Sequence, residues 1–273
     1  MARIVQVGAG SGGMVVLDLV CRDPRVTHIT IIEPDVYKPH NVDRHYFPPR
    51  AVGEFKAELA ADWLRERRPE LQIDLLLQDL CDPAAQDGIE KAVAAADVGI
   101  CAVDNEPAKF HFDCLMRKHK KPWTLGEVLS GGIGGFVHCF MAEGPCYGCV
   151  ASHLKRDVAE EKAAPAPDYS QPGGPAPEVT IPASKAAIHA IAGLHAVVTL
   201  GLVAEPERFD PGFTSMLLTL QRVPELFEEA FRPHRLRIPR SAECLICRPT
   251  PLPDPAEDLD VALDQALARL GHA

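Results

Sequence analysis

Positive charge is scarce in this chain of 273 residues, where 28 lysines and arginines face 38 aspartates and glutamates, a formal net charge of −10. Proteins that bind nucleic acid or anionic membranes over a broad surface need clustered positive charge, so we expect neither partner. With 47% hydrophobic and 24% charged residues, the composition excludes a disordered or collagen-like chain. No internal repeat is found either. What remains is a globular protein with a full core.

An export signal is also missing from the first residues, MARIV, which are typical of a strand. We therefore expect a cytoplasmic protein, in which the nine cysteines stay reduced and indicate a metal site more than disulfides. The one long apolar stretch, residues 186–204, contains two histidines and two glycines and has a charged residue on each flank. A buried core helix explains it better than a membrane span.

The first half of the chain alternates short apolar runs with helical patterns. We expect strands at residues 3–7, 28–33, 71–77, 98–103 and 122–125, and helices at residues 11–21, 53–68, 83–95 and 107–119. Strands separated by helices of this length indicate βαβ units. The fold class is therefore α/β, a Rossmann-like doubly wound and mostly parallel sheet.

The second half changes character. We expect additional, antiparallel strands at residues 133–141, 213–222 and 236–239, and a buried helix at residues 183–203. Many of the 25 prolines gather in a long crossover loop, residues 155–182, and in a linker that begins at residue 249. We expect one domain over residues 1–248, followed over residues 249–273 by the linker and an amphipathic helix.

A glycine loop follows the first expected strand and opens a helix. Gly8, Gly10 and Gly13 fit the G-x-G-x-x-G pattern, and Gly12 adds a further glycine. The glycines let the backbone approach a ligand, and the helix N-terminus favours an anion. Glu33 follows twenty residues beyond Gly13, where an acidic side chain can bind ribose hydroxyls. By themselves these features indicate an adenine nucleotide or a dinucleotide.

Polar side chains follow the second and fourth expected strands. They are Asp35, Asn41, Arg44, Lys56 and Asp104. In an open parallel sheet these positions gather at the carboxyl ends of the strands, where ligands bind. Each of them alone could be a surface ion pair. Together, two cations, an amide and carboxylates around a glycine loop suit a triphosphate with Mg²⁺.

Two cysteine pairs, Cys146-x-x-Cys149 and Cys244-x-x-Cys247, are candidate metal ligands. Four thiolates suit a tetrahedral structural zinc. The gap between the pairs is too long for a simple zinc ribbon, so the spacing leaves open whether they bind metal. For the other cysteines we expect buried, inert thiols.

These motifs resemble those of the adenylating enzymes of the ThiF, MoeB and ubiquitin-activating superfamily. The family pattern is a glycine loop, Asp-x-Asp after the second strand, Asn-x-x-Arg-Gln, a Lys that opens the next helix, and an Asp after the fourth strand. Here it reads Gly8–Gly13, Glu33-Pro34-Asp35, Asn41-Val42-Asp43-Arg44-His45, Lys56 and Asp104, within a resemblance that extends from Arg3 to about Cys247. Glu33 replaces the usual Asp, and His45 replaces the usual Gln.

The resemblance implies ATP-dependent adenylation of the C-terminal glycine carboxylate of a ubiquitin-like or sulfur-carrier protein. Arg44 and Lys56 would then meet the phosphates with help from Asn41, Asp104 would hold Mg²⁺, and Glu33 and Asp35 would hold the ribose side. The four paired cysteines would bind a structural zinc, as in many members of the family. Gly126 and the glycines at 131–135 lie where the family's carrier tail enters. A homodimer and a conjugating or sulfurtransferase partner are also implied.

Two features of the family are absent. Between Val150 and Glu243 there is no cysteine, so a thioester in the usual crossover-loop position is not expected. The chain also begins at the first strand, so an arginine supplied by an N-terminal helix of a dimer partner would have to come from elsewhere. Two other hypotheses remain: an NAD-dependent oxidoreductase, which leaves Asn41, Arg44, Lys56 and Asp104 without a role, and a non-catalytic partner subunit of a heteromeric activating enzyme. A small-peptide carboxylate substrate is also open.

Overall fold

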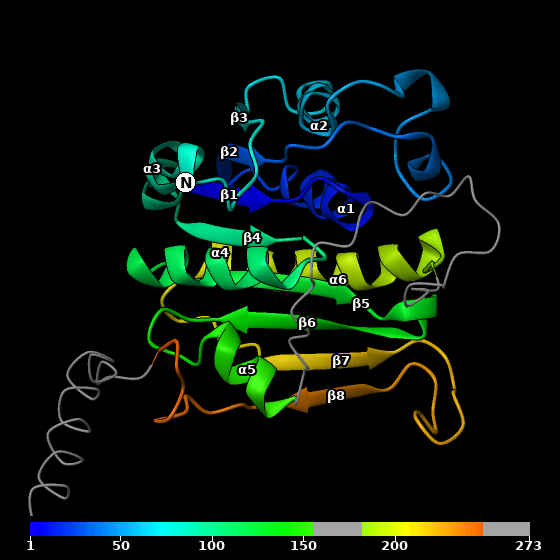
Figure 1. Cartoon of the computed structure of the whole chain (residues 1–273), viewed down its shortest axis with the longest axis vertical. Coiled ribbons are helices and arrows are strands. Elements are labelled where there is room, and N and C mark those ends of the chain that lie inside the picture. Colours follow the sequence, from blue (N-terminus) through cyan, green and yellow to red (C-terminus); the bar gives the residue numbers. More distant parts are fainter. Residues whose placement is uncertain (155–181, 248–273) are drawn as a thin grey trace, which may run out of the picture.

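An eight-stranded mixed sheet organises the computed structural model, which describes residues 1–154 and 182–247 (Figure 1). The spatial order of the strands is β3-β2-β1-β4-β5-β6-β7-β8. The strands are β1 Ala2–Val7, β2 Val26–Ile32, β3 Gln72–Leu76, β4 Val98–Cys101, β5 Trp123–Val128, β6 Gly134–Phe140, β7 Ser215–Thr219 and β8 Pro233–Leu236. The expected crossover loop and C-terminal helix lie outside the described residues, apart from Pro182.

Helices cover both faces of this sheet. They are α1 Ser11–Val20, α2 Lys56–Arg65, α3 Gln86–Ala95, α4 Glu106–Lys118, α5 Tyr147–His153 and α6 Lys185–Ala204. Buried side chains of α1, α2 and α6 share one core with the sheet, and those of α3, α4 and α5 share a second core. A sheet that is buried on both faces needs strands that are apolar throughout, and β1, β2 and β4 are almost wholly buried.

Strand direction changes at β5. Strands β3, β2, β1, β4 and β5 are parallel, so their carboxyl ends meet at one edge. Strands β5 and β6 then form an antiparallel hairpin in which Glu127 lies opposite Phe136. Its turn contains Gly131 and Gly132 at φ angles of 72° and 66°, a backbone conformation that favours glycine. The hairpin therefore brings its turn to the edge where the parallel strands end.

Helix α6 is long and apolar enough to cross a membrane. It packs against α1, β5 and β6, and 56% of its most apolar window is buried inside the protein. Its apolar composition is therefore explained by its place in the core. This confirms the buried helix expected from the sequence.

The expected fold class is confirmed: parallel strands come first and antiparallel strands follow. One strand position was wrong. The expected strand at 236–239 overlaps β8 only at Leu236, because β8 pairs with β7 through Pro233–Leu236 and the following residues leave the sheet. Among the single cysteines, burial is confirmed for Cys21, Cys101 and Cys139, whereas Cys81 and Cys114 are exposed.

Two glycines of α6 provide a matched test of this packing. A Cβ atom at Gly201 would lie 2.2 Å from the Phe209 ring, whereas a Cβ atom at Gly193 would meet nothing within 4 Å. We expect Gly193→Ala to stabilise the protein by about 0.5–1 kcal/mol, because alanine favours a helix, and Gly201→Ala to destabilise it by about 1–3 kcal/mol. Urea unfolding midpoints measure both changes, and equal shifts in the two variants would contradict the packing.

Candidate functional site

The glycine loop joins β1 to α1, and each of its glycines meets a different constraint. Gly8 has a φ angle of 91°, and a Cβ atom there would lie 2.6 Å from the carbonyl oxygen of Ala102. A Cβ atom at Gly13 would lie 2.3 Å from the carbonyl oxygen of Gly8. Gly10, the residue before α1, has open space at its Cβ position. Gly8 and Gly13 thus allow the tight turn and the close helix packing, and Gly10 leaves room for a ligand.

Buried polar side chains fix the shape of this loop. The Gln6 amide donates to the carbonyl oxygens of Gly8 and Gly13, both at 2.9 Å. The Glu33 carboxylate accepts from the backbone N–H of Ala9 at 2.7 Å and from that of Asp35 at 3.0 Å. Burial raises the pKa of Glu33, although the Ala9 N–H opposes that shift. The residue expected to bind ribose is therefore also a support of the glycine loop.

His45 binds the other backbone polar group of Ala9, its carbonyl oxygen. Its Nδ1 accepts from the Tyr46 backbone N–H at 3.0 Å, so its Nε2 carries the proton and donates to the Ala9 carbonyl oxygen at 3.1 Å. Burial lowers the pKa of His45 to about 4. Lys185, at the start of α6, donates to the His45 carbonyl oxygen at 3.0 Å. A neutral His45 therefore ties the glycine loop, the segment after β2 and α6 together.

Lys56 and Asp35 form an ion pair beside this loop. The Nζ atom of Lys56 lies 2.6 Å from Oδ2 of Asp35, and the lysine side chain is only 10% exposed. Asn41 is buried, and its Oδ1 accepts from the Lys38 backbone N–H at 2.9 Å. The structure thus brings Asp35 and Lys56 together, while the Asn41 side chain shapes the segment after β2.

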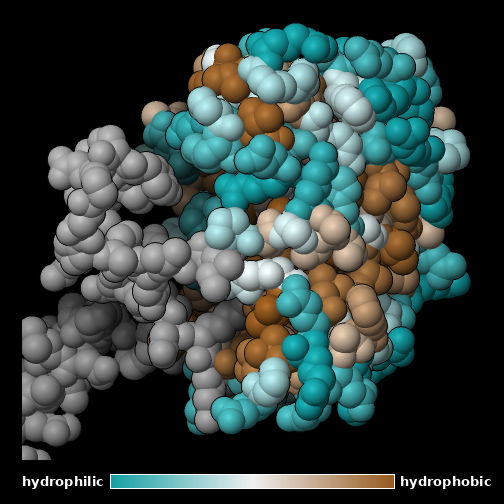
Figure 2. Space-filling model, turned by 90° about the vertical axis from the view of Figure 1, so that its right-hand side faces the viewer, coloured by the Kyte–Doolittle hydropathy of each residue, from teal (hydrophilic) through white to brown (hydrophobic). Residues whose placement is uncertain are grey.

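Arg44 and Asp104 differ from these residues, because their side chains make no hydrogen bond or ion pair within residues 1–154 and 182–247. Arg44 is half-buried and directly precedes His45, which binds the glycine loop. Asp104 is exposed and follows β4 two residues after Ala102, which contacts Gly8. Figure 2 shows the edge to which the parallel strands point, where hydrophilic residues cover the upper part and apolar residues gather at mid-height. Among the described residues, a guanidinium and a carboxylate without side-chain partners therefore lie close in the chain to residues that contact the glycine loop.

A buried lysine lies at the start of α4, close to Asp104 in the chain. The Nζ atom of Lys109 contacts carboxylate oxygens of Glu106 and Glu127, both at 2.6 Å. Burial opposes its charge, but the carboxylates outweigh burial and raise the pKa of Lys109. Tyr147 donates to Glu106 at 2.7 Å, and His138 lies 2.9 Å from Glu127. Within the described residues, this network joins α4 to the hairpin and to α5.

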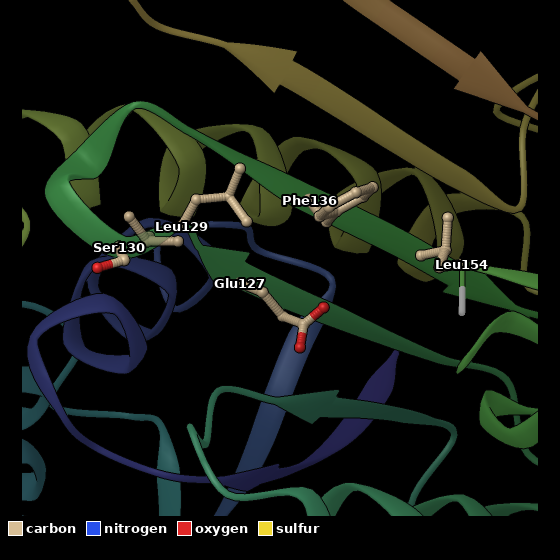
Figure 3. A pocket seen from close by; sticks show the side chains of 6 residues that line it. Glu127, Leu129, Ser130, Phe136 and Leu154 are labelled. Carbon is tan, nitrogen blue, oxygen red and sulfur yellow. The ribbon is translucent and has the colours of Figure 1, made fainter. Parts of the chain in front are cut away.

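A pocket of about 380 Å³ lies beside that network. Figure 3 shows Glu127 and Phe136 on the two hairpin strands, with Leu129 and Ser130 at the turn and Leu154 after α5. The lining is mainly apolar, with the Glu127 carboxylate as its charged group. The pocket therefore has room for several residues of an extended peptide.

The four paired cysteines form one buried cluster. The Cys146 sulfur lies 3.7 Å from that of Cys149 and 3.4 Å from that of Cys244, and the Cys149 and Cys247 sulfurs are 3.5 Å apart. A disulfide would need about 2.0 Å, whereas a tetrahedral zinc with ligands at about 2.3 Å separates its sulfurs by about 3.8 Å. Backbone N–H groups also donate to the cluster, from Cys149 to Cys146 and from Ser241 to Cys149. The cluster therefore fits a structural zinc.

Together, the fold and this site define a Rossmann-like protein with a glycine-loop nucleotide site and a four-cysteine cluster. A comparison with known families identifies it further. The sequence profile described as the ThiF family matches residues 1–244, and the chain belongs to this family.

Individual relatives are distant. The ubiquitin-like modifier-activating enzyme 5 of Bombyx mori is 21% identical over 169 residues, which cover 58% of this chain and 42% of that protein. The crystal structure of E. coli MccB has a TM-score of 0.67 at 15% identity, with 93% of this chain and 67% of that chain covered. Its complex with ATP has a TM-score of 0.63 at 15% identity, with coverages of 90% and 66%. These structures show the shared fold, and this chain spans less than half of the curated relative.

Sequence reasoning missed the supporting residues. Gln6, Lys185 and His195 carry no motif, and the Lys109 network joins residues far apart in the chain. His45 gave one signal, as a departure from the family pattern. A polar side chain inside an apolar strand or helix was the other available clue.

His45 makes stability depend on pH. Its pKa is about 4 in the folded protein and about 6.5 in the unfolded chain, so its contribution is present above pH 6.5 and is lost as the pH falls toward 4. Between pH 7 and pH 5 we expect the free energy of unfolding of the wild type to fall by about 2 kcal/mol more than that of His45→Gln. The glutamine amide can still donate to the Ala9 carbonyl oxygen but does not take up a proton in this range. Urea unfolding at the two pH values measures this, and equal losses in both proteins would contradict the neutral, buried His45.

The cysteine cluster predicts about one zinc ion per chain. We expect Cys244→Ser to lose the metal and to unfold at a lower temperature, because binding of a structural zinc contributes directly to folding. The matched control is Cys81→Ser, at an exposed cysteine outside the cluster. Elemental analysis and thermal unfolding measure both effects. Metal-free wild-type protein with the stability of the metal-loaded protein would show that the cluster has no structural metal.

Proposed function

We propose that this protein uses ATP to adenylate the C-terminal carboxylate of a polypeptide. The carboxylate oxygen attacks the α-phosphorus of ATP, the bond to the bridging oxygen breaks, and an acyl-adenylate and pyrophosphate are formed. The observation that carries the proposal is that Arg44 and Asp104, which have no side-chain partner among the described residues, lie next to residues that contact a glycine loop whose Gly10 has room for a ligand. ThiF family membership supports it.

Each charged group has a distinct role in this proposal. Arg44 and Lys56 stabilise negative charge that develops on the phosphates, and the N-terminus of α1 adds the partial charge of its free N–H groups. Asp104 offers carboxylate oxygens, the ligands that Mg²⁺ prefers, and Mg²⁺ supplies further neutralisation of phosphate charge. Glu33 and Asp35 serve the ribose side. Glu33 retains acceptor capacity after its two backbone bonds, since a carboxylate has about four lone-pair sites.

For the substrate we propose a ubiquitin-like or sulfur-carrier protein with a C-terminal glycine, or a small peptide. The names of two similar proteins support this class: a ubiquitin-like modifier-activating enzyme, and the microcin C7 biosynthetic enzyme MccB in complex with N-formylated MccA. The pocket beside the hairpin has room for an extended tail. The sequence has no cysteine between Val150 and Glu243, so the acyl group passes directly to an acceptor or to a conjugating or sulfurtransferase partner. A homodimer is part of the proposal.

Arg44 provides a clean test because its removal leaves no described side chain without a partner. We expect Arg44→Ala to lower polypeptide-dependent ATP–pyrophosphate exchange by at least about a hundredfold, as electrostatic groups at transition states commonly do. Asp104→Asn should lower it similarly, and both variants should unfold at the wild-type temperature. Arg50→Ala, at an exposed arginine of the same segment, is the matched control.

Ligand-dependent thermal unfolding separates the proposal from the oxidoreductase hypothesis. Mg·ATP at a hundred times its dissociation constant stabilises a protein by about 2.7 kcal/mol. We expect this shift in the wild type and its loss in Asp104→Asn. Stabilisation by NAD instead of Mg·ATP, or full exchange activity in Arg44→Ala, would exclude the proposal.

A further inference from the structure

The turn that carries Asp104 joins β4 to α4 and is held from both sides. Because the Asp104 side chain has no partner among the described residues, the backbone around it determines where its carboxylate lies. On the β4 side, the Ala102 backbone N–H donates to the Val7 carbonyl oxygen at 2.9 Å, and the Ala102 carbonyl oxygen lies against Gly8. This side of the turn is therefore fixed to the glycine loop.

On the α4 side, side chains hold the first turn of the helix. The Asn105 side chain caps α4 by accepting from the Ala108 backbone N–H at 2.9 Å. Glu106 is the first residue of α4, and one of its carboxylate oxygens lies 2.6 Å from Nζ of Lys109. Its other oxygen accepts from the Tyr147 hydroxyl at 2.7 Å. The start of α4 is thus held by a residue from outside the helix, Tyr147.

Tyr147 belongs to the first cysteine pair. It directly follows Cys146, lies two residues before Cys149, and is the first residue of α5. Its side chain is fully buried, and its ring packs edge-on against that of Phe110 in α4, with the ring centroids 5.0 Å apart. The hydroxyl that binds Glu106 is therefore tied to the position of the cysteine pair.

The position of this pair depends on what joins it to the second pair. Cys244 follows Cys146 by 98 residues, and Cys247 follows Cys149 by 98 residues. Four thiols form no covalent link at these sulfur distances, and four thiolates repel one another. A zinc ion would remove the repulsion and join the two pairs, as structural zinc does when it contributes to folding.

We propose that Tyr147 is a positioning residue for the magnesium site, and that zinc in the cysteine cluster strengthens the binding of Mg·ATP through it. The proposal rests on the adenylation function, in which Asp104 holds Mg²⁺. The cysteine pair fixes Tyr147, the Tyr147 hydroxyl holds Glu106, and Glu106 holds the first turn of α4 beside Asp104. Coupling between two binding sites is reciprocal, so Mg·ATP strengthens zinc binding by the same factor.

The variant Tyr147→Phe removes the hydroxyl and keeps the ring and the cysteines. Calorimetry with and without Mg²⁺ measures the dissociation constant of ATP. We expect Kd for Mg·ATP to rise at least about fivefold and Kd for ATP without Mg²⁺ to stay unchanged, because Asp104 acts on the nucleotide through the metal. Zinc content should equal that of the wild type. Unchanged Mg·ATP binding, or equal weakening with and without Mg²⁺, overturns the inference.

Tyr37→Phe is the matched control. Tyr37 is also fully buried, and its hydroxyl donates to the Phe47 carbonyl oxygen at 2.6 Å in the segment after β2. We expect the two variants to lose similar amounts of stability in urea. The ratio of Kd with Mg²⁺ to Kd without Mg²⁺ should change only in Tyr147→Phe. The same change of ratio in Tyr37→Phe would show a general effect of a lost buried hydroxyl and would exclude the assignment to Tyr147.

A double-mutant cycle shows whether Tyr147 acts through Glu106. Glu106→Ala removes the acceptor, while Lys109 keeps Glu127 as its partner. We expect Tyr147→Phe to weaken Mg·ATP binding in the wild-type background and to have no further effect in Glu106→Ala. Additive effects of the two changes would contradict the proposed path.

The zinc side is measured by binding and not by activity. Competition with a chromophoric chelator selective for zinc over Mg²⁺ gives the Kd for zinc with and without Mg·ATP. We expect Mg·ATP to lower this Kd at least about fivefold in the wild type and to lose the effect in Tyr147→Phe. Asp104→Asn corrects for zinc bound by ATP itself. A protein that binds no zinc, or one whose zinc affinity ignores Mg·ATP, overturns the inference.

These experiments also separate the two proposals. If the wild type does not bind Mg·ATP, the proposed function fails together with the inference. If it binds Mg·ATP, loses that binding in Asp104→Asn and keeps it fully in Tyr147→Phe, the proposed function stands and the inference alone is wrong.

Discussion

Ala9 is held through both of its backbone polar groups, and the site depends on this constraint. Its N–H binds the Glu33 carboxylate and its carbonyl oxygen binds the neutral His45 ring. The two anchors come from the end of β2 and from the segment after it, so the glycine loop and the β2–α2 segment cannot move independently. Lys185 extends the connection to α6 through the His45 carbonyl oxygen. A glycine loop that would otherwise have many conformations is thereby fixed for a ligand.

The charged residues of the site fall into two groups, which differ in whether their charge is paired within the described part of the chain. Lys56 and Lys109 are buried and paired with carboxylates, so removing the carboxylates would leave a buried ammonium group without a counter-charge. Arg44 and Asp104 are unpaired within the described chain, and their charge has no structural use there. Side chains that contribute nothing to folding and flank a glycine loop are available for a ligand, which is why they support the proposed function more strongly than the paired residues.

Distance in sequence explains which parts of the site could be predicted. The glycine loop, Glu33 and Lys56 occur in local patterns that reflect strand–turn–helix geometry. The Thr124–Thr199–His195 hydrogen bonds join β5 to α6, and the Lys109 network joins α4 to the hairpin. No local pattern marks these pairs, because each partner alone is an ordinary polar residue in an apolar element.

The sequence by itself determined the alternation of strands and helices, the glycine loop and the two cysteine pairs, because each depends on neighbouring residues. Only the tertiary structure decided that the four cysteines form one cluster and that Glu33 supports the loop. It likewise decided that the His195 ring packs against Gly126 and lies in hydrogen-bond contact with Thr124. Strand β8 shows the same limit, since its position depends on pairing with β7 and not on its own apolar pattern. Local propensity selects the elements, whereas contacts between distant residues select their partners, their register and the groups that remain free for chemistry.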